Sequence, residues 1–146
     1  MGSNLNIMSA NSSSPSSPSY ITCAQLQEML QSPETKPKTL IVDVRDEDRS
    51  EGWIDESFNW PTSELRSGGT KQNAEMMNDF LTKQLSAGRT NIVFHCQWSQ
   101  MRGPWAAKRA VEVCAKNSSL AGKMRILILQ GGFMEWRRCF PDLVKK

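Results

Sequence analysis

Histidine is almost absent from this chain, and cysteines are few and widely separated. The sequence contains one histidine and four cysteines, and no two cysteines form a C-x-x-C pair. Structural zinc sites take four ligands from closely spaced cysteines and histidines, so we expect no metal site. The N-terminus does not resemble a secretory signal, which favours free thiols in a reducing compartment over disulfides.

A long hydrophobic run and a strong charge bias are also missing. No apolar stretch is long enough to cross a bilayer, and the formal net charge is only +3 over 146 residues. Nucleic-acid-binding domains carry a dense basic surface, so we expect neither a membrane nor a nucleic acid as a partner. We expect a monomer located in the cytoplasm, with the nucleus as a further location.

Serine and proline dominate residues 12–19, a composition typical of disordered segments. We therefore divide the chain into a disordered arm, residues 1–19, and one domain, residues 20–146. The length of this domain suits a single hydrophobic core.

Two kinds of apolar segment alternate along the domain. Short runs rich in β-branched residues predict buried strands, and apolar residues at helical spacing predict amphipathic helices. The predicted strands cover residues 39–45, 91–95 and 124–129, with a weaker candidate at 57–61, and the predicted helices cover residues 21–30, 74–85, 103–115 and 131–138. This alternation predicts an α/β domain with a mainly parallel sheet and helices on both faces.

Local signals mark the ends of three predicted helices. Thr22 carries the hydroxyl favoured at a helix N-cap. Pro104 suits a first helical turn, where its missing N–H has no effect. Gly88 suits the position that follows a helix C-terminus.

The segment NIVFHCQWSQMRGPWAAKRA, residues 91–110, places the only histidine, His95, before Cys96 and Arg102. A cysteine and an arginine at this spacing can recur by chance. Their context is more specific, because Cys96 follows a predicted strand and Arg102 precedes a predicted helix. The residues between them are therefore expected to form a tight turn at the carboxyl end of the sheet, where open α/β folds bind their ligands.

Such a turn can bind a tetrahedral oxyanion. Successive backbone N–H groups can converge on one point, the next helix presents its positive end, and Arg102 can grip two oxygens. The same field stabilises a Cys96 thiolate, a nucleophile for phosphorus, arsenic or sulfur. We predict that Cys96 and Arg102 are catalytic. The predicted oxyanion-binding residues are Gln97, Trp98, Ser99, Gln100, Met101 and Arg102.

Three segments resemble one known family. HCQWSQMRGP resembles the H-C-x-x-S-x-x-R-G-P loop of the M-phase-inducer dual-specificity phosphatases and of the eukaryotic arsenate reductases, which both have the rhodanese-like fold. LIVDVRDEDRSEGWI resembles the family's I-D-V-R and G-H-I stretch, and ILILQGGFMEWRR resembles its closing L-x-G-G-F-x-x-W element. The resemblance spans residues 20–138 and implies a rhodanese-like catalytic domain. It also implies a loop one residue longer than that of sulfurtransferases, which disfavours sulfur transfer.

From this resemblance we expect a protein tyrosine or dual-specificity phosphatase that forms a phosphocysteine. Its substrates would be phosphorylated proteins or small aryl phosphates, and it would need no cofactor. An alternative is arsenate reduction by the same two residues, with glutathione or glutaredoxin as the external reductant. A non-catalytic phosphate-binding module is a third hypothesis, from a different class.

Three positions depart from the family pattern. Gln97 stands where the M-phase inducers have a glutamate that has been considered as a proton donor. Trp53 replaces the histidine of G-H-I, and Val44 replaces a second cysteine that can protect the nucleophile. The resemblance therefore leaves the proton donor unassigned and implies that the protective disulfide is absent.

The other polar residues near these motifs are assigned supporting roles. Asp43 and His95 are expected to hold the turn in place rather than to react. Residues 46–48, an acidic run, are expected to be solvated, although one of them could reach the site as an acid. Trp98 and Trp105 flank the turn and form either an exposed rim or part of the packing. The remaining cysteines, Cys23, Cys114 and Cys139, are expected to be buried.

Overall fold

Parallel strands form the centre of the protein, whose computed structural model describes residues 17–146. The five strands of the described sheet lie in the order β1-β6-β5-β2-β4, and all are parallel. They are β1 (Ser19–Ile21), β2 (Thr39–Asp43), β4 (Phe58–Asn59), β5 (Asn91–His95) and β6 (Arg125–Leu129). Most of the predicted arm, residues 1–16, lies outside the described residues.

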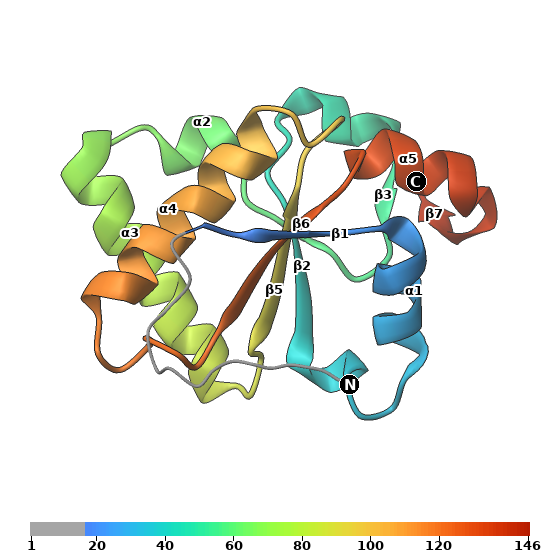
Figure 1. Cartoon of the computed structure of the whole chain (residues 1–146). Coiled ribbons are helices and arrows are strands. Elements are labelled where there is room, and N and C mark those ends of the chain that lie inside the picture. The colour runs from blue at the N-terminus through green and yellow to red at the C-terminus, as the bar shows by residue number, and fades with distance from the viewer. Residues whose placement is uncertain (1–16) are drawn as a thin grey trace.

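Helices cover both faces of this sheet (Figure 1). One face carries α2 (Thr62–Leu65), α3 (Gly69–Ser86) and α4 (Arg102–Lys116), and the other carries α1 (Cys23–Gln31) and α5 (Gly132–Cys139). The predicted α/β class, with a parallel sheet between two helical layers, is therefore confirmed.

The alternation of side chains along each strand explains the two hydrophobic cores. Ile92 and Phe94 of β5 pack in the core beneath α3 and α4, whereas Val93 packs in the core beneath α1 and α5. A strand buried on both faces needs apolar residues at successive positions. This requirement accounts for the continuous apolar run that predicted β5.

Short elements complete the chain. They are the 3-10 helices η2 (Lys36–Lys38), η3 (Glu47–Glu51) and η4 (Pro141–Leu143), and an antiparallel pair formed by β3 (Trp53–Ile54) and β7 (Val144–Lys145). The sequence did not predict β1, β3 or β7. Two or three residues are too few to show the alternation by which strands are recognised.

The helix ends follow the predicted signals with small shifts. The Thr22 hydroxyl accepts a hydrogen bond from the Gln25 N–H at 3.1 Å, and the Gln25 side chain accepts one from the Thr22 N–H at 2.8 Å. This capping box starts α1 after Ile21, which belongs to β1. Gly88 follows α3 with a φ of 82°. The start of α3 at Gly69, rather than residue 74, was missed because its first turn is polar and shows no apolar period.

Parallel pairing brings the ends of β2, β4 and β5 together at one edge of the sheet. Asp43 is the register partner of both Asn59 and His95. The chain then leaves β5 through the turn to α4, at the upper edge of Figure 1. The residues singled out in the sequence therefore meet at this edge.

Among residues 17–146, no helix is long and apolar enough to span a membrane. The same residues contain no group of three His, Cys, Asp or Glu side chains that could hold a metal ion.

Candidate active site

The turn between β5 and α4 brings Cys96 and Arg102 together. Cys96 directly follows β5 and is 3% exposed, and Arg102 is the first residue of α4. The Arg102 guanidinium lies close enough to Cys96 for the two side chains to interact electrostatically. This is the arrangement expected of a thiolate beside an oxyanion-binding arginine.

Backbone amides of the turn have no acceptor. Within the described part of the chain, none of the N–H groups of residues 97–101 donates a hydrogen bond to another residue. Native proteins rarely leave a run of amides unpaired. Such a run is typical of a concave anion-binding site.

Helix α5 fixes the direction of two of these amides. The N–H of Phe133 donates to the Cys96 carbonyl at 3.0 Å, and that of Met134 donates to the Gln97 carbonyl at 3.0 Å. The C=O and N–H of a trans peptide unit point in opposite directions, and no described peptide bond is cis. The N–H groups of Gln97 and Trp98 therefore point away from α5.

Ser99 adopts an uncommon backbone conformation inside the turn. Its φ is 54°, in the left-handed region that non-glycine residues rarely occupy. The residue is 5% exposed, and its hydroxyl has no hydrogen-bond partner. Strained backbone and an unsatisfied buried hydroxyl are features that accumulate at functional sites.

Two glycines allow the neighbouring helices to approach the turn closely. A Cβ on Gly132 would lie 2.5 Å from the Cys96 carbonyl oxygen, and one on Gly103 would lie 3.1 Å from the His95 Cα. Gly132 also has a φ of 63°, which favours glycine. Close contact of α5 with the turn therefore depends on Gly132.

A buried ion pair supports the turn from beneath. The side chains of Asp43 and Arg45 are fully buried and lie 2.8 Å apart. Arg45 also donates to Gln97 Oε1 at 2.9 Å and to the Gly52 carbonyl at 2.7 Å. Burial opposes ionisation of Asp43, but His95 and the Arg45 hydrogen bonds outweigh it and hold the pKa of Asp43 below its ordinary value.

The Gln97 side chain is directed toward this support. In addition to accepting from Arg45, it donates from Nε2 to the Met134 sulfur at 3.2 Å. The position at which the M-phase inducers have a glutamate is thus occupied by a neutral side chain with both polar ends engaged.

His95 is fully buried behind the turn. Its Nδ1 lies 3.0 Å from the Cys96 carbonyl oxygen, and its Nε2 lies 3.9 Å from the Asp43 carboxylate. Burial lowers the pKa of His95, so the ring is neutral at physiological pH. A neutral ring that donates from Nδ1 to the carbonyl of Cys96, the predicted nucleophile, is suited to positioning.

For the acidic run, the structure supports the second of the two sequence-based expectations, that one of its residues reaches the site. Asp48 is not merely solvated, because its carboxylate accepts two hydrogen bonds from Arg102, at 2.6 and 3.1 Å. Asp46 lies 3.6 Å from the same guanidinium. The hydrogen bond from Arg102 lowers the pKa of Asp48, and the same bond raises that of Arg102. The one sequence feature that pointed to the contact between Asp48 and Arg102 was an acidic run shortly after β2, the strand that pairs with β5.

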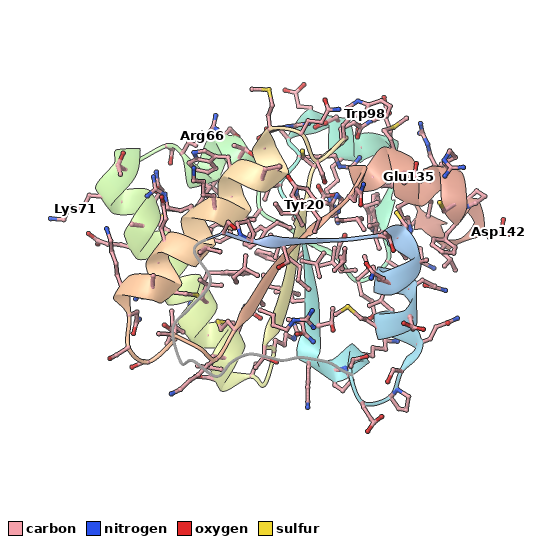
Figure 2. All side chains as sticks on the ribbon, viewed as in Figure 1. Tyr20, Arg66, Lys71, Trp98, Glu135 and Asp142 are labelled. Atoms are coloured by element: carbon pink, nitrogen blue, oxygen red, sulfur yellow. The ribbon has the colours of Figure 1, made fainter. Side chains whose placement is uncertain are left out.

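The two tryptophans beside the turn have different environments. Trp98 is 55% exposed and Met101 is 78% exposed. Figure 2 shows Trp98 at the edge of the molecule near α5. Trp105 instead packs against the core beneath the Arg66 guanidinium, 4.3 Å from the ring centroid. Trp98 and Met101 therefore form the exposed rim.

The remaining cysteines are free thiols that differ in exposure. Cys139 is exposed, so the expectation that it is buried was wrong; it lies at the last turn of a short surface helix. Burial raises the pKa of the Cys23 thiol to about 12 and that of Cys114 to about 11. Neither of these two buried thiols ionises near neutral pH.

Comparison with known proteins identifies relatives across most of the chain. Residues 22–139 match the rhodanese-like domain family, which confirms the resemblance of the three sequence segments. The chain is 32% identical over 121 residues to the dual specificity phosphatase Cdc25 of Arabidopsis thaliana, covering 81% of this chain and 72% of that protein. It is 31% identical over 103 residues to the CDC25-like phosphatase YCH1 of Saccharomyces cerevisiae, covering 70% and 68%.

A solved structure extends the likeness to three dimensions. The As-Sb reductase from Leishmania major matches with a TM-score of 0.73 and 27% sequence identity, over 87% of this chain and 84% of that one. Its name and those of the two phosphatases describe different reactions on related chains.

Replacement of Gly132 by alanine is expected to disturb the turn specifically. The added Cβ would overlap the Cys96 carbonyl oxygen, so the variant should lose stability and bind inorganic phosphate more weakly. Gly88→Ala is the matched control, because its φ is also positive but a Cβ there meets nothing within 4 Å. That control should lose only the roughly 1–2 kcal/mol of left-handed strain. Equal phosphate binding by the two variants would contradict the prediction.

Stability is expected to fall as the pH is lowered from about 7.5 to about 5.5. The unfolded chain takes up a proton on its single histidine below about pH 6.5, whereas native His95, with its lowered pKa, does not. The free energy of unfolding should therefore decrease by up to ~1.4 kcal/mol per pH unit. In urea titrations, His95→Gln should remove this slope; an equally steep slope in the variant would rule out His95 as its source.

Proposed function

The chain belongs to the rhodanese-like domain family, and within that family we propose that it is a cysteine-based protein tyrosine or dual-specificity phosphatase. The observation that carries the proposal is the run of unpaired amides at residues 97–101, closed at one end by Cys96 and at the other by Arg102. These groups match the charge and shape of a phosphoryl group. The names of the Arabidopsis and yeast relatives support the same reaction class.

The proposed reaction has two steps. In the first, the Cys96 thiolate attacks phosphorus, the S–P bond forms, and the O–P bond to the leaving oxygen breaks. The turn amides and Arg102 hold the equatorial oxygens, whose charge they stabilise most in the transition state. In the second, water attacks the phosphocysteine, releases inorganic phosphate and restores the thiolate.

Supporting roles are proposed for the groups behind the turn. Asp43 holds Arg45, which in turn holds the Gln97 side chain. His95 holds the Cys96 carbonyl. These contacts keep the amides directed at the substrate without touching it, so we propose them as positioning residues.

The rim suggests how substrates are accommodated. Trp98 and Met101 are exposed beside the turn and could contact the aryl ring of phosphotyrosine or of a small aryl phosphate. We also propose that the enzyme acts as a monomer in the cytoplasm or nucleus, without a metal or cofactor.

Arsenate reduction is the second candidate, favoured by the likeness to the Leishmania major reductase. Cys96 would attack arsenic in the same anion site, so that an As–S bond forms and one arsenate oxygen leaves as water. A further thiol would then attack the Cys96 sulfur, so that a disulfide forms and As(V) leaves as As(III). The raised pKa values of Cys23 and Cys114 make these buried thiols poor resolving groups. These two thiols therefore do not supply the reductant, and we propose that it comes from outside, as glutathione or glutaredoxin.

Loss of Cys96 is expected to abolish aryl phosphate hydrolysis. With p-nitrophenyl phosphate, Cys96→Ser should lower kcat by ~10⁴–10⁶-fold because the nucleophile is gone. Arg102→Ala should lower it by roughly 10²–10³-fold because one oxyanion ligand is gone. Cys139→Ser, which removes an exposed thiol, should retain full activity. Retention of hydrolysis by Cys96→Ser would exclude the mechanism.

The same wild-type and Cys96→Ser preparations separate the two candidate activities. Arsenate reduction is followed by NADPH consumption in the presence of glutathione, glutaredoxin and glutathione reductase. Phosphatase activity without NADPH consumption supports the first candidate. Cys96-dependent NADPH consumption without ester hydrolysis would replace it by the second.

A further inference from the structure

The proposed phosphatase reaction still needs a proton donor. The leaving oxygen of an alkyl or unactivated aryl phosphate departs with an electron pair and is a poor leaving group unless it is protonated. The family resemblance suggests the residue after the nucleophile, but here that residue is Gln97, an amide that cannot supply a proton. The donor is therefore either the substrate's own monoprotonated phosphate or another group in the structure.

Two other ionisable groups near the turn are unsuitable. Asp43 is fully buried and engaged by Arg45 and Arg49. His95 is fully buried, and its Nδ1 is committed to the Cys96 carbonyl. Neither side chain can reach a leaving group on the open side of the turn.

Asp48 is both engaged with the catalytic arginine and open to solvent. Its carboxylate pairs with both terminal nitrogens of Arg102, while the side chains of Asp48 and Arg102 remain 29% and 30% exposed. A carboxylate in this position accepts from the two terminal N–H groups of the guanidinium, which would otherwise donate to two phosphate oxygens. Asp48 thus marks where the substrate oxygens would lie.

The surface next to Asp48 has room for a leaving group. An open depression of about 620 Å³ is lined by Asp46, Glu47, Asp48, Pro61 and Ser63. Asp46 is anchored in it, because its Oδ1 accepts hydrogen bonds from the Ser63 N–H at 3.1 Å and the Ser63 hydroxyl at 2.7 Å. The Asp48 carboxylate has one backbone anchor, since its Oδ1 accepts a hydrogen bond from the Asp46 N–H at 3.0 Å. Its Oδ2 is hydrogen-bonded to Arg102 instead, so this oxygen can change partner while the segment stays in place.

From this geometry we propose that Asp48 is the proton donor, held on Arg102 in the free enzyme and released when the substrate phosphate takes over that arginine. This proposal rests on the phosphatase function proposed above. Arg102 exchanges one bidentate acid partner for another, so the exchange leaves its charge paired throughout. The freed carboxyl group then lies at the rim of the anion site, beside the depression.

Binding of the substrate favours the acid form of Asp48. In the free enzyme, the hydrogen bond from Arg102 lowers its pKa. After the exchange, the charged groups that face it are the bound phosphate, Asp46 and Arg45, whose guanidinium donates to the Asp48 carbonyl at 3.4 Å. A neighbouring dianion and a lost cationic partner both favour protonation, and bulk water supplies the proton.

The proton balance closes over the two steps. As the O–P bond breaks, its electron pair passes to the leaving oxygen, which takes the proton from Asp48. As water attacks the phosphocysteine, the Asp48 carboxylate accepts the proton that the water loses, and the S–P electron pair returns to Cys96. The net reaction is hydrolysis of the ester to an alcohol and inorganic phosphate.

The test compares two esters that differ in their need for an acid. Asp48→Asn should lower kcat for phenyl phosphate by about 10²-fold or more, and by less than about threefold for p-nitrophenyl phosphate, whose leaving group departs without protonation. The decline in phenyl phosphate kcat at high pH should also disappear. Because Arg102 loses its hydrogen-bonded carboxylate partner, inhibition by inorganic phosphate should become several-fold stronger.

Two further variants separate chemistry from folding. Asp48→Glu should restore part of the phenyl phosphate activity, since it restores a carboxyl group. Glu51→Gln removes one exposed negative charge from the same 3-10 helix and should leave both rates unchanged. Urea unfolding of each variant checks that the segment is intact.

The opposing outcomes are distinct. Equal loss for both esters, or no loss for either, would overturn the role of Asp48 while the phosphatase function stands. If the wild-type chain hydrolyses neither ester, the proposed function fails and the acid role with it. Unchanged phosphate binding by Asp48→Asn, measured by calorimetry, would separately overturn the exchange at Arg102.

Discussion

Unpaired amides at residues 97–101 are the constraint on which the arrangement of the site depends. An amide without an acceptor destabilises the native state by roughly 1–3 kcal/mol if it is buried away from water. A run of them persists only where the surrounding structure holds the backbone in place. The neighbours of the turn do this: α5 binds two of its carbonyls, and His95 binds one of the same carbonyls from beneath.

Arg45 links this constraint to the rest of the fold. It is fully buried, pairs with Asp43 at the end of β2, and also bonds the Gly52 carbonyl and the Gln97 side chain. A buried ion pair is weak evidence for stability, because desolvation of the charges offsets their attraction. Here the pair fixes the positions of its neighbours, since the Arg45 guanidinium bonds three segments that meet at the carboxyl edge of the sheet.

The sequence predicted those parts of the protein whose signal is local. The strand before Cys96 is recognisable because it is buried on both faces, and the turn after it because a cysteine, an arginine and a proline follow at fixed positions. The pairing of Asp48 with Arg102 could not be predicted in this way, because the two residues lie 54 positions apart and only the β2–β5 register brings their segments together. Likewise, Cys139 is exposed because α5 ends at the surface. The fact that the residue is a cysteine does not predict this position.

Among the aspartate–arginine pairs at this edge of the sheet, Asp43–Arg45 and Asp48–Arg102 have opposite properties because their surroundings differ. The pair of Asp43 and Arg45 is sealed from water, so separation of its charges would leave an ion buried without a partner, a change that costs several kcal/mol. The pair of Asp48 and Arg102 is about 30% exposed on both sides, where solvent screening leaves an ion pair worth about 1 kcal/mol or less. In the proposed mechanism, a phosphate dianion held also by the turn amides would displace so weak a partner, whereas it would not displace the buried one. Exposure, rather than residue type, therefore separates the arginine that holds the fold from the arginine that we propose binds the substrate.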